Sequence, residues 1–142
     1  MSTRPIRFFG DPILNSAASP VTRFDASLQT LVRDMFDTMA AAGGVGLAAN
    51  QIGVARRVFV FNCQGMRGAL VNPVWRPLGQ AAQTGAEGCL SIPGVRAPVT
   101  RHARVIASGA DVDGRAVTVR ADGLLARCIQ HETDHLDGVL FL

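Results

Sequence analysis

The sequence predicts an α+β fold, with mostly antiparallel short strands around a central helix near the C-terminus and one further helix near the N-terminus. Three observations support this prediction. Apolar residues recur at helical spacing from residue 28 to residue 39, a second helical pattern covers about 123–137, and short apolar runs separated by turn residues lie between them. Helix, strands and helix in this order are typical of an α+β domain with a mostly antiparallel sheet.

The first predicted helix begins near Asp25 or Ser27, because aspartate and serine are both favourable N-caps. Its apolar residues fall on one face and predict packing against a core. They are Leu28, Leu31, Val32, Met35, Phe36 and Met39. Gly43 and Gly44 end the helical pattern.

The region after this helix predicts several strands. Residues 57–61, Arg-Val-Phe-Val-Phe, indicate a buried strand, and residues 69–71 indicate another. Residues 105–108 and 116–119 flank Asp113-Gly114, a dipeptide typical of tight hairpin turns. These last two runs therefore predict an antiparallel hairpin.

The second helix is predicted from about Gly123 to Asp137, with Asp122 as its N-cap and Gly138 as its stop. Spacings of four, three and four residues place four side chains on one face of this helix. They are Leu124, Cys128, His131 and His135. This face is apolar at its start and rich in metal-binding groups at its end.

Length and composition limit the class of protein. A chain of 142 residues predicts a single domain over 1–142, and 48% apolar with 18% charged residues is an ordinary globular balance. No apolar run is long enough for a membrane span, and the N-terminus lacks the apolar core of a signal peptide. A cytoplasmic protein is therefore expected.

The charge pattern argues against a nucleic-acid-binding protein, and the cysteine content argues against a disulfide-stabilised protein. The formal net charge is +3, and all fourteen basic residues are arginine, but they are scattered along the chain. Nucleic-acid binding is disfavoured because no basic stripe forms. The chain has an odd number of cysteines, three, and its N-terminus lacks a secretory signal. Both observations argue against a disulfide framework.

The segment His131-Glu132-Thr133-Asp134-His135 carries the clearest chemical signal. Two imidazoles four residues apart on a helix can bind one metal ion, while the glutamate between them stays free as a base. This arrangement is typical of enzymes in which a metal activates water for hydrolysis.

The third metal ligand separates the classes of hydrolase. Metzincin proteases extend the pattern to a third histidine. This chain matches that extension up to Gly138, but Phe141 stands where the histidine is needed. Thermolysin-type enzymes take a later glutamate as the third ligand, and residues 136–142 contain none.

The third ligand is therefore expected upstream. The candidates are Cys63, Cys89, His102 and several acidic residues. Cys89 stands out because flanking glycine and proline mark a strand that ends or bends there. Cys63 follows an apolar strand and is more consistent with burial.

Three separated motifs resemble the peptide deformylases. The first is Gly44-Val-Gly-Leu-Ala-Ala-Asn-Gln51, the second is Glu87-Gly-Cys-Leu-Ser91, and the third is Gln130-His-Glu-Thr-Asp-His135. They occur in the family's order and spacing, and the similarity extends from Phe9 to Phe141.

The resemblance implies a role for each residue of the site. Cys89, His131 and His135 would bind one divalent metal ion, Fe²⁺ in cells and Zn²⁺, Ni²⁺ or Co²⁺ in some preparations. Glu132 would be the general acid and base, while Gln51 and the backbone N–H of Leu90 would stabilise the oxyanion. The reaction would remove the N-formyl group from the N-terminal formylmethionine of new polypeptides and release formate.

The resemblance also implies where the peptide binds. The nascent chain would lie as an extra extended strand between the 44–46 loop and the 87–88 segment. The substrate-binding residues would be Val45, Gly46, Glu87, Gly88, Arg96, Leu124 and Cys128. The partners would be N-formylmethionyl peptides and, transiently, the ribosome, without nucleic-acid specificity and without a membrane.

Some residues depart from the family pattern. Many relatives continue into a long C-terminal helix, whereas this chain ends at Leu142. Gly85 and Ala86 are small, and Arg127 stands where many relatives have an aliphatic residue. A related hydrolase acting on another small N-acyl substrate is the alternative. A non-catalytic relative is disfavoured, because a purely structural metal site needs neither Glu132 nor Gln51.

Overall fold

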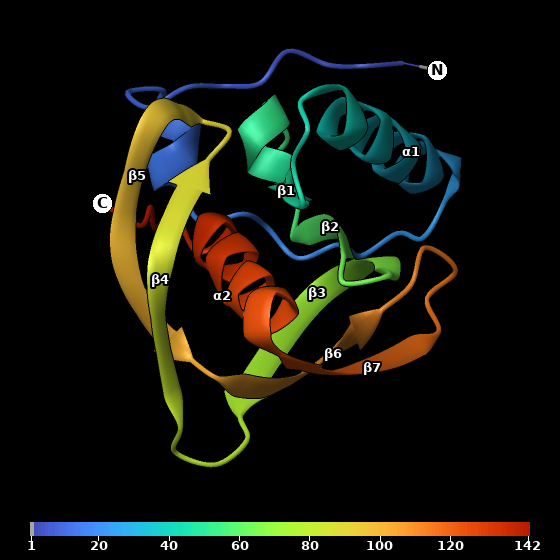
Figure 1. Ribbon diagram of the computed structural model, residues 1–142. Helices are drawn as coiled ribbons and strands as arrows, with labels where there is room; N and C mark the ends of the chain where they lie inside the picture. The colour runs from blue at the N-terminus through green and yellow to red at the C-terminus, as the bar shows by residue number, and fades with distance from the viewer. Residues whose placement is uncertain (1) are drawn as a thin grey trace.

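The computed structural model of the chain describes residues 2–142 and has the predicted α+β fold (Figure 1). Two α-helices lie in these residues, α1 (Ala26–Ala41) and α2 (Gly123–Leu136). The strands are β1 (Gly46–Ala48), β2 (Val58–Cys63), β3 (Met66–Pro77), β4 (Ala82–Cys89), β5 (Ile92–His102), β6 (Arg104–Ala110) and β7 (Ala116–Asp122). Short 3-10 turns occupy Pro12–Asn15 and Ala49–Ile52.

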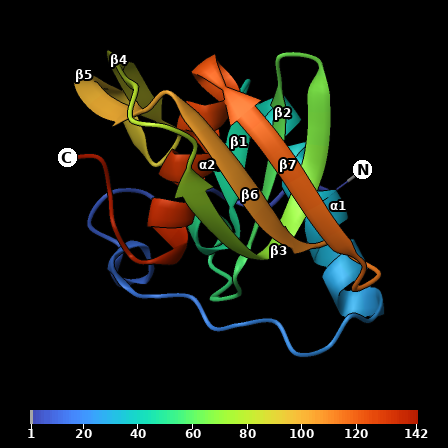
Figure 2. The same cartoon turned by 90° about the horizontal axis from the view of Figure 1, so that it is seen from below.

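The strands form two antiparallel sheets. The larger has five strands in the order β1-β2-β3-β6-β7, and the smaller is the pair β4-β5. Figure 2 shows β6 and β7 running side by side across α2, with the β4-β5 pair at one end of the molecule. The helix α2 therefore has sheet on more than one side. Its face with Cys128, His131 and His135 is buried.

The strand β2 explains how both helices attach to the larger sheet. Val58 and Val60 pack in the same cluster as the apolar face of α1, whereas Phe59 and Phe61 pack with Leu125 and other residues of α2. Side chains alternate between the two faces of a strand. An uninterrupted apolar run is therefore needed here, because both faces of β2 are covered.

The sequence-based boundaries of several elements are confirmed. Asp25 caps α1, and its carboxylate accepts hydrogen bonds from the amides of Ser27 and Leu28. The predicted hairpin is β6-β7, with Gly114 in its turn at φ +82°. The predicted end of α2 is wrong by one residue. Asp137 caps the helix because Gly138 turns the chain at φ +77°.

The sequence predicted the β4-β5 pair only at Cys89, where a strand was expected to end or bend. Its sequence has few of the alternating β-branched and aromatic residues that indicate a strand, and β5 contains two prolines. Pairing along its whole length, from Ala82 with His102 to Cys89 with Ile92, supplies the order that local preference lacks. This pair carries Cys89 to α2.

No helix within residues 2–142 is long and apolar enough to cross a membrane.

Phe59→Ala is expected to lower the free energy of unfolding by about 3–5 kcal/mol, because it leaves a cavity beneath α2. Phe59 is fully buried. Urea denaturation measures the loss. Phe8→Ala is the matched control, since Phe8 is 55% exposed. A loss below about 1 kcal/mol for Phe59→Ala would contradict its place in the core.

Candidate active site

The helix α2 positions two histidines on one buried face. His131 and His135 are one turn apart, and they are 8% and 1% exposed. Cys89 reaches them from the end of β4, where the β4-β5 register shifts between Gly88 and Cys89. This irregularity ends the regular pairing at the residue whose thiol faces α2.

The donor atoms of these three side chains converge. The Sγ of Cys89 lies 3.2 Å from Nε2 of His135, which lies 3.1 Å from Nε2 of His131. All three donor atoms lie within 4.8 Å of one another. A tetrahedral ion with ordinary bond lengths needs nitrogen and sulfur donors roughly 3.3–3.6 Å apart. The arrangement is therefore a Cys-His-His metal-binding site.

The other two upstream candidates for the third ligand lie elsewhere. Cys63 is buried at the end of β2, as expected, and burial raises the pKa of its thiol. The His102 ring packs against Trp75 with ring centroids 5.5 Å apart. All three cysteines, which fall within residues 2–142, are free thiols.

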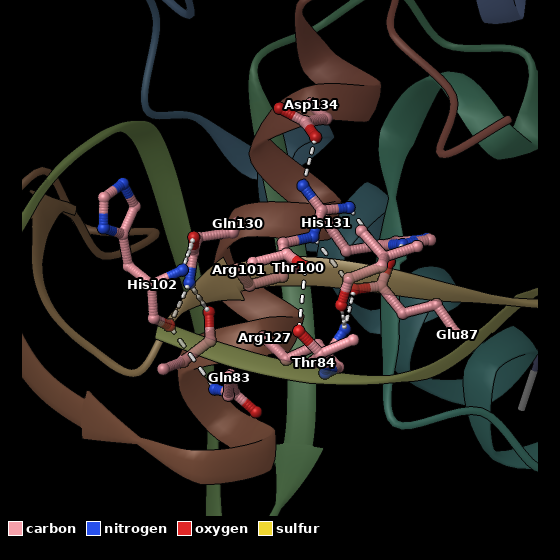
Figure 3. A network of polar contacts seen from close by, with 12 residues as sticks. Gln83, Thr84, Glu87, Thr100, Arg101, His102, Arg127, Gln130, His131 and Asp134 are labelled. Carbon is pink, nitrogen blue, oxygen red and sulfur yellow. Dashed lines mark hydrogen bonds and ion pairs between the residues drawn. The ribbon is translucent and has the colours of Figure 1, made fainter. Parts of the chain in front are cut away.

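Glu87 orients His131 through Nδ1, the ring nitrogen that does not face the metal-binding site. Although burial favours its neutral form, hydrogen bonds from Arg101 and His131 hold the pKa of Glu87 well below its usual range. The ionised carboxylate therefore accepts a hydrogen bond from Nδ1 of His131 at 2.9 Å (Figure 3). A carboxylate on the second imidazole nitrogen fixes the tautomer of a metal-binding histidine, which leaves Nε2 free to bind.

The pKa values of the two histidines differ in direction. Burial opposes the charged form of His131, but hydrogen bonds to Cys89 and Glu87 raise its pKa to about 10. Burial and the neighbouring His131 lower the pKa of His135 to about 3. His135 is therefore neutral near pH 7, whereas His131 holds a proton in the ion-free site. Both imidazoles must be neutral to bind a metal ion, so metal binding would release that proton.

Glu132 is buried beside the metal-binding atoms. Its Oε1 has no hydrogen-bond partner among the described residues, and burial raises its pKa to about 7. A carboxylate with a pKa near the working pH is well suited to accept and return a proton. The unpaired oxygen is available to a water or a substrate.

Gln51 presents a fixed N–H donor to the same space. Its Oε1 accepts a hydrogen bond from the Ala48 amide at 2.9 Å, which directs Nε2 toward the site. That Nε2 lies 3.1 Å from Oγ of Ser91 and 3.6 Å from Sγ of Cys89. The carboxamide is 1% exposed, and its donor lies next to the predicted ligand.

A cavity of about 620 Å³ opens over these groups. Of the residues to which the family resemblance gave a role, all but His135 line it: Val45, Gly46, Gln51, Glu87, Gly88, Cys89, Leu90, Arg96, Leu124, Cys128, His131 and Glu132. Val45 and Leu124 are 43% and 47% exposed. The cavity therefore combines an apolar rim with the polar groups described above.

The family model described as "Polypeptide deformylase" matches residues 3–142. The chain belongs to the polypeptide deformylase family. It is therefore a metal-dependent hydrolase, as the three motifs predicted.

Relatives from different organisms agree with this deformylase assignment. "Peptide deformylase 1" of Corynebacterium efficiens is 63% identical over 100% of this chain and 86% of its own length. Among solved structures, the peptide deformylase from Thermotoga maritima is 38% identical with a TM-score of 0.95, over 99% of this chain and 95% of that one. The peptide deformylase from Synechococcus elongatus, solved in complex with actinonin, is 43% identical with a TM-score of 0.93. The match covers 97% of this chain and 76% of that one.

Several contacts around this site were not predicted from the sequence. Arg101 donates to both oxygens of Glu87 and to Asp134, although these residues lie 14 and 33 positions away. Asn50 donates to the backbone oxygen of His135, 85 positions away. Phe141, which cannot bind metal, lies with its ring centroid 6.0 Å from that of His131.

Gly46→Ala is expected to reduce deformylation by about a hundredfold, because small displacements of catalytic groups carry costs of this size. A Cβ at Gly46 would lie 2.6 Å from Sγ of Cys128 and 2.7 Å from Oε2 of Glu132. Formate release measures the effect, and thermal unfolding shows whether the fold is retained. Full activity in a folded variant would contradict the close packing of Glu132 against this loop.

Proposed function

We propose that this chain removes the N-formyl group of N-formylmethionyl peptides with one divalent ion held by Cys89, His131 and His135, and that the ion in cells is Fe²⁺. The whole of residues 1–142 would act as one catalytic domain. The observation that carries the proposal is the convergence of this soft donor set with Glu132 and the Gln51 amide around one cavity. Thiolate and imidazole ligands accept Fe²⁺, Zn²⁺, Co²⁺ and Ni²⁺.

The bound ion would supply Lewis acidity, which activates water and polarises a carbonyl. Glu132 takes a proton from the attacking water and later gives it to the departing amine. As water adds to the formyl carbon, negative charge develops on the formyl oxygen. The Nε2–H of Gln51 and the backbone N–H of Leu90 donate hydrogen bonds to that oxygen. Breakage of the C–N bond gives formate and a free N-terminal amine.

The cavity would bind the first residue and the backbone of the peptide. Val45, Leu124 and Cys128 offer apolar surface for the methionine side chain. The 44–46 loop and Gly88 flank the cavity and would pair with the peptide as an added strand. Arg96 lines the outer part, where it would contact residues beyond methionine.

Glu87 holds a different position from the other predicted substrate-binding residues. Its side chain is 4% exposed and is engaged by Arg101, Arg127 and His131. We infer that the 87–88 segment meets the peptide through its backbone, while the Glu87 carboxylate serves the metal-binding site.

The place of action follows from the substrate. We infer that the chain acts in the cytoplasm, where formylated polypeptides leave the ribosome, and that it associates with the ribosome transiently. Its scattered arginines support no sequence-specific contact with nucleic acid.

Anaerobic measurement of formate release from formyl-Met peptides tests the function. Acetyl-Met peptides and formyl peptides without methionine serve as matched substrates. The proposal expects the highest kcat/KM for the formyl-Met peptide. A preference for an acetylated or non-methionine peptide would instead favour a hydrolase of another small N-acyl group.

Gln51→Leu is expected to reduce kcat by about 10²–10³-fold, the usual cost of removing one oxyanion donor. Metal content is expected to stay unchanged, because Gln51 is not a proposed ligand. Formate release and metal analysis measure the two quantities, and Gln29→Leu on the exposed face of α1 is the control. A normal kcat in the Gln51 variant would exclude the oxyanion role.

A further inference from the structure

Arg127 is an arginine in the interior, on the same helix as the two histidines. It precedes His131 by one turn of α2, so the two side chains leave the same face of the helix. Its side chain is 8% exposed. Arginine is almost never buried without a partner, so this guanidinium is expected to have charged or polar partners in the interior.

The guanidinium of Arg127 contacts the carboxylate that orients His131. Its Nη1 donates to Oε2 of Glu87 at 2.5 Å and to the backbone oxygen of Val99 at 3.0 Å. The other oxygen of Glu87 accepts from Nδ1 of His131 at 2.9 Å. A continuous path therefore runs from α2 through β4 and back to α2 (Figure 3).

Arg101 holds the same carboxylate from β5. Its Nε and Nη2 each lie 2.9 Å from one oxygen of Glu87. Arg101 also binds Asp134 at 2.6 Å, and the Asp134 side chain is 32% exposed. Arg127 forms a second ion pair with Glu87. It does so from α2, the helix that carries the metal-binding imidazoles.

Gly85 provides the space for this guanidinium. A Cβ at Gly85 would lie 3.4 Å from Nη2 and 3.8 Å from Cζ of Arg127. Gly85 pairs with Val99, whose carbonyl accepts from Arg127. Its φ is not in the left-handed region, so the backbone conformation does not require glycine. A Cβ alone would touch the guanidinium at ordinary contact distance, whereas a larger side chain at this position would compete with it for the same space.

We propose that Arg127 is a positioning residue for His131, acting through Glu87, and that Gly85 and Arg127 work as a pair. The inference rests on the proposed function, because it takes His131 as a metal ligand. Its consequence is that the Arg127 contact contributes to metal affinity, although Arg127 lies outside the metal-binding set.

The first experiment compares Arg127→Met, Arg127→Lys and the wild-type chain by chelator competition with Co²⁺. Arg127→Met is expected to bind Co²⁺ up to about tenfold more weakly, the lower end of the usual cost of losing a partner behind a metal ligand, because Arg101 still holds Glu87. Its visible Co²⁺ absorption is expected to shift as the His131 ring loses its fixed orientation. Arg127→Lys keeps a donor for Glu87 and is expected to restore part of the affinity.

Arg57→Met is the matched control for loss of a helix anchor. Arg57 ties the other end of α2 to the sheet region, donating to the Leu136 oxygen at 2.9 Å and to Asp137 at 2.8 Å. It does not contact Glu87. Thermal unfolding is expected to show destabilisation in both methionine variants, but weaker Co²⁺ binding only in Arg127→Met.

Gly85→Val tests the pair without changing the arginine. The added side chain is expected to displace the guanidinium and to weaken Co²⁺ binding. In the double variant Gly85→Val/Arg127→Met the two losses are expected to be strongly non-additive, because the valine no longer displaces an arginine.

The outcomes separate this inference from the proposed function. A wild-type chain that binds no divalent ion would overturn the proposed function and this inference with it. A wild-type chain that binds Co²⁺ and deformylates, with Arg127→Met and Gly85→Val unchanged in affinity and absorption, would overturn the role of Arg127 alone.

Discussion

Glu132→Gln is expected to lower kcat for deformylation by about a thousandfold or more, toward the upper end for loss of a general base. Glutamine keeps the size of the side chain but cannot take a proton from water. The contrast should be large because Glu132 is 4% exposed and its Oε1 has no partner within residues 2–142.

Formate release under anaerobic conditions measures this loss, and metal analysis of the same sample shows whether the ion is retained. Retention is expected, because Glu132 is not in the Cys-His-His set. Asp113→Asn, in the exposed β6-β7 turn, controls for the loss of one negative charge. Normal turnover by metal-loaded Glu132→Gln would refute the proposed mechanism.

Cys89→Ala is expected to abolish both metal binding and deformylation. It removes the sulfur donor, which is the one ligand of the set that comes from outside α2. Two imidazoles alone make a weaker and less defined site, because structural and catalytic sites for such ions use three or four protein ligands. Activity is therefore expected to fall to the level of a sample without ion.

Metal content per chain and formate release, measured together, test this prediction. Cys63→Ala is the matched control, because Cys63 is also a free cysteine but lies at the end of β2, away from the two histidines. It is expected to lose some stability and to keep its ion. A Cys89→Ala chain with full metal content would show that another residue completes the site.

The two histidines and the glutamate between them were predictable from local sequence. Helix geometry alone brings side chains four residues apart onto one face, and Gly138 turns the chain just after the helix. At the start of α2, Asp122 makes no side-chain cap hydrogen bond, and the distant Gln64 accepts from the Leu125 amide instead. The stripe of α1 and the β6-β7 turn follow from the same short-range rules.

The third ligand was not decided by local rules. From the residues alone, the candidates were Cys63, Cys89, His102 and several acidic residues, among which Cys89 stood out, and the family resemblance selected it. In the fold, Cys89 is the candidate that the β4-β5 pair carries to α2, while His102 packs on Trp75. Strand pairing joins residues far apart in the chain, so the place of Cys89 beside α2 is a property of the tertiary structure that no local rule gives.

The environment of His131 shows the same division most clearly. The spacing of His131 from His135 is a local property of α2, so it could be predicted from the sequence alone. The carboxylate behind it comes from β4, and the two guanidiniums that hold that carboxylate come from β5 and α2. Buried charges are stable only when their partners meet in one place. Long-range packing of three elements therefore decided which of the fourteen arginines serve the site, and short-range helix geometry decided where its histidines stand.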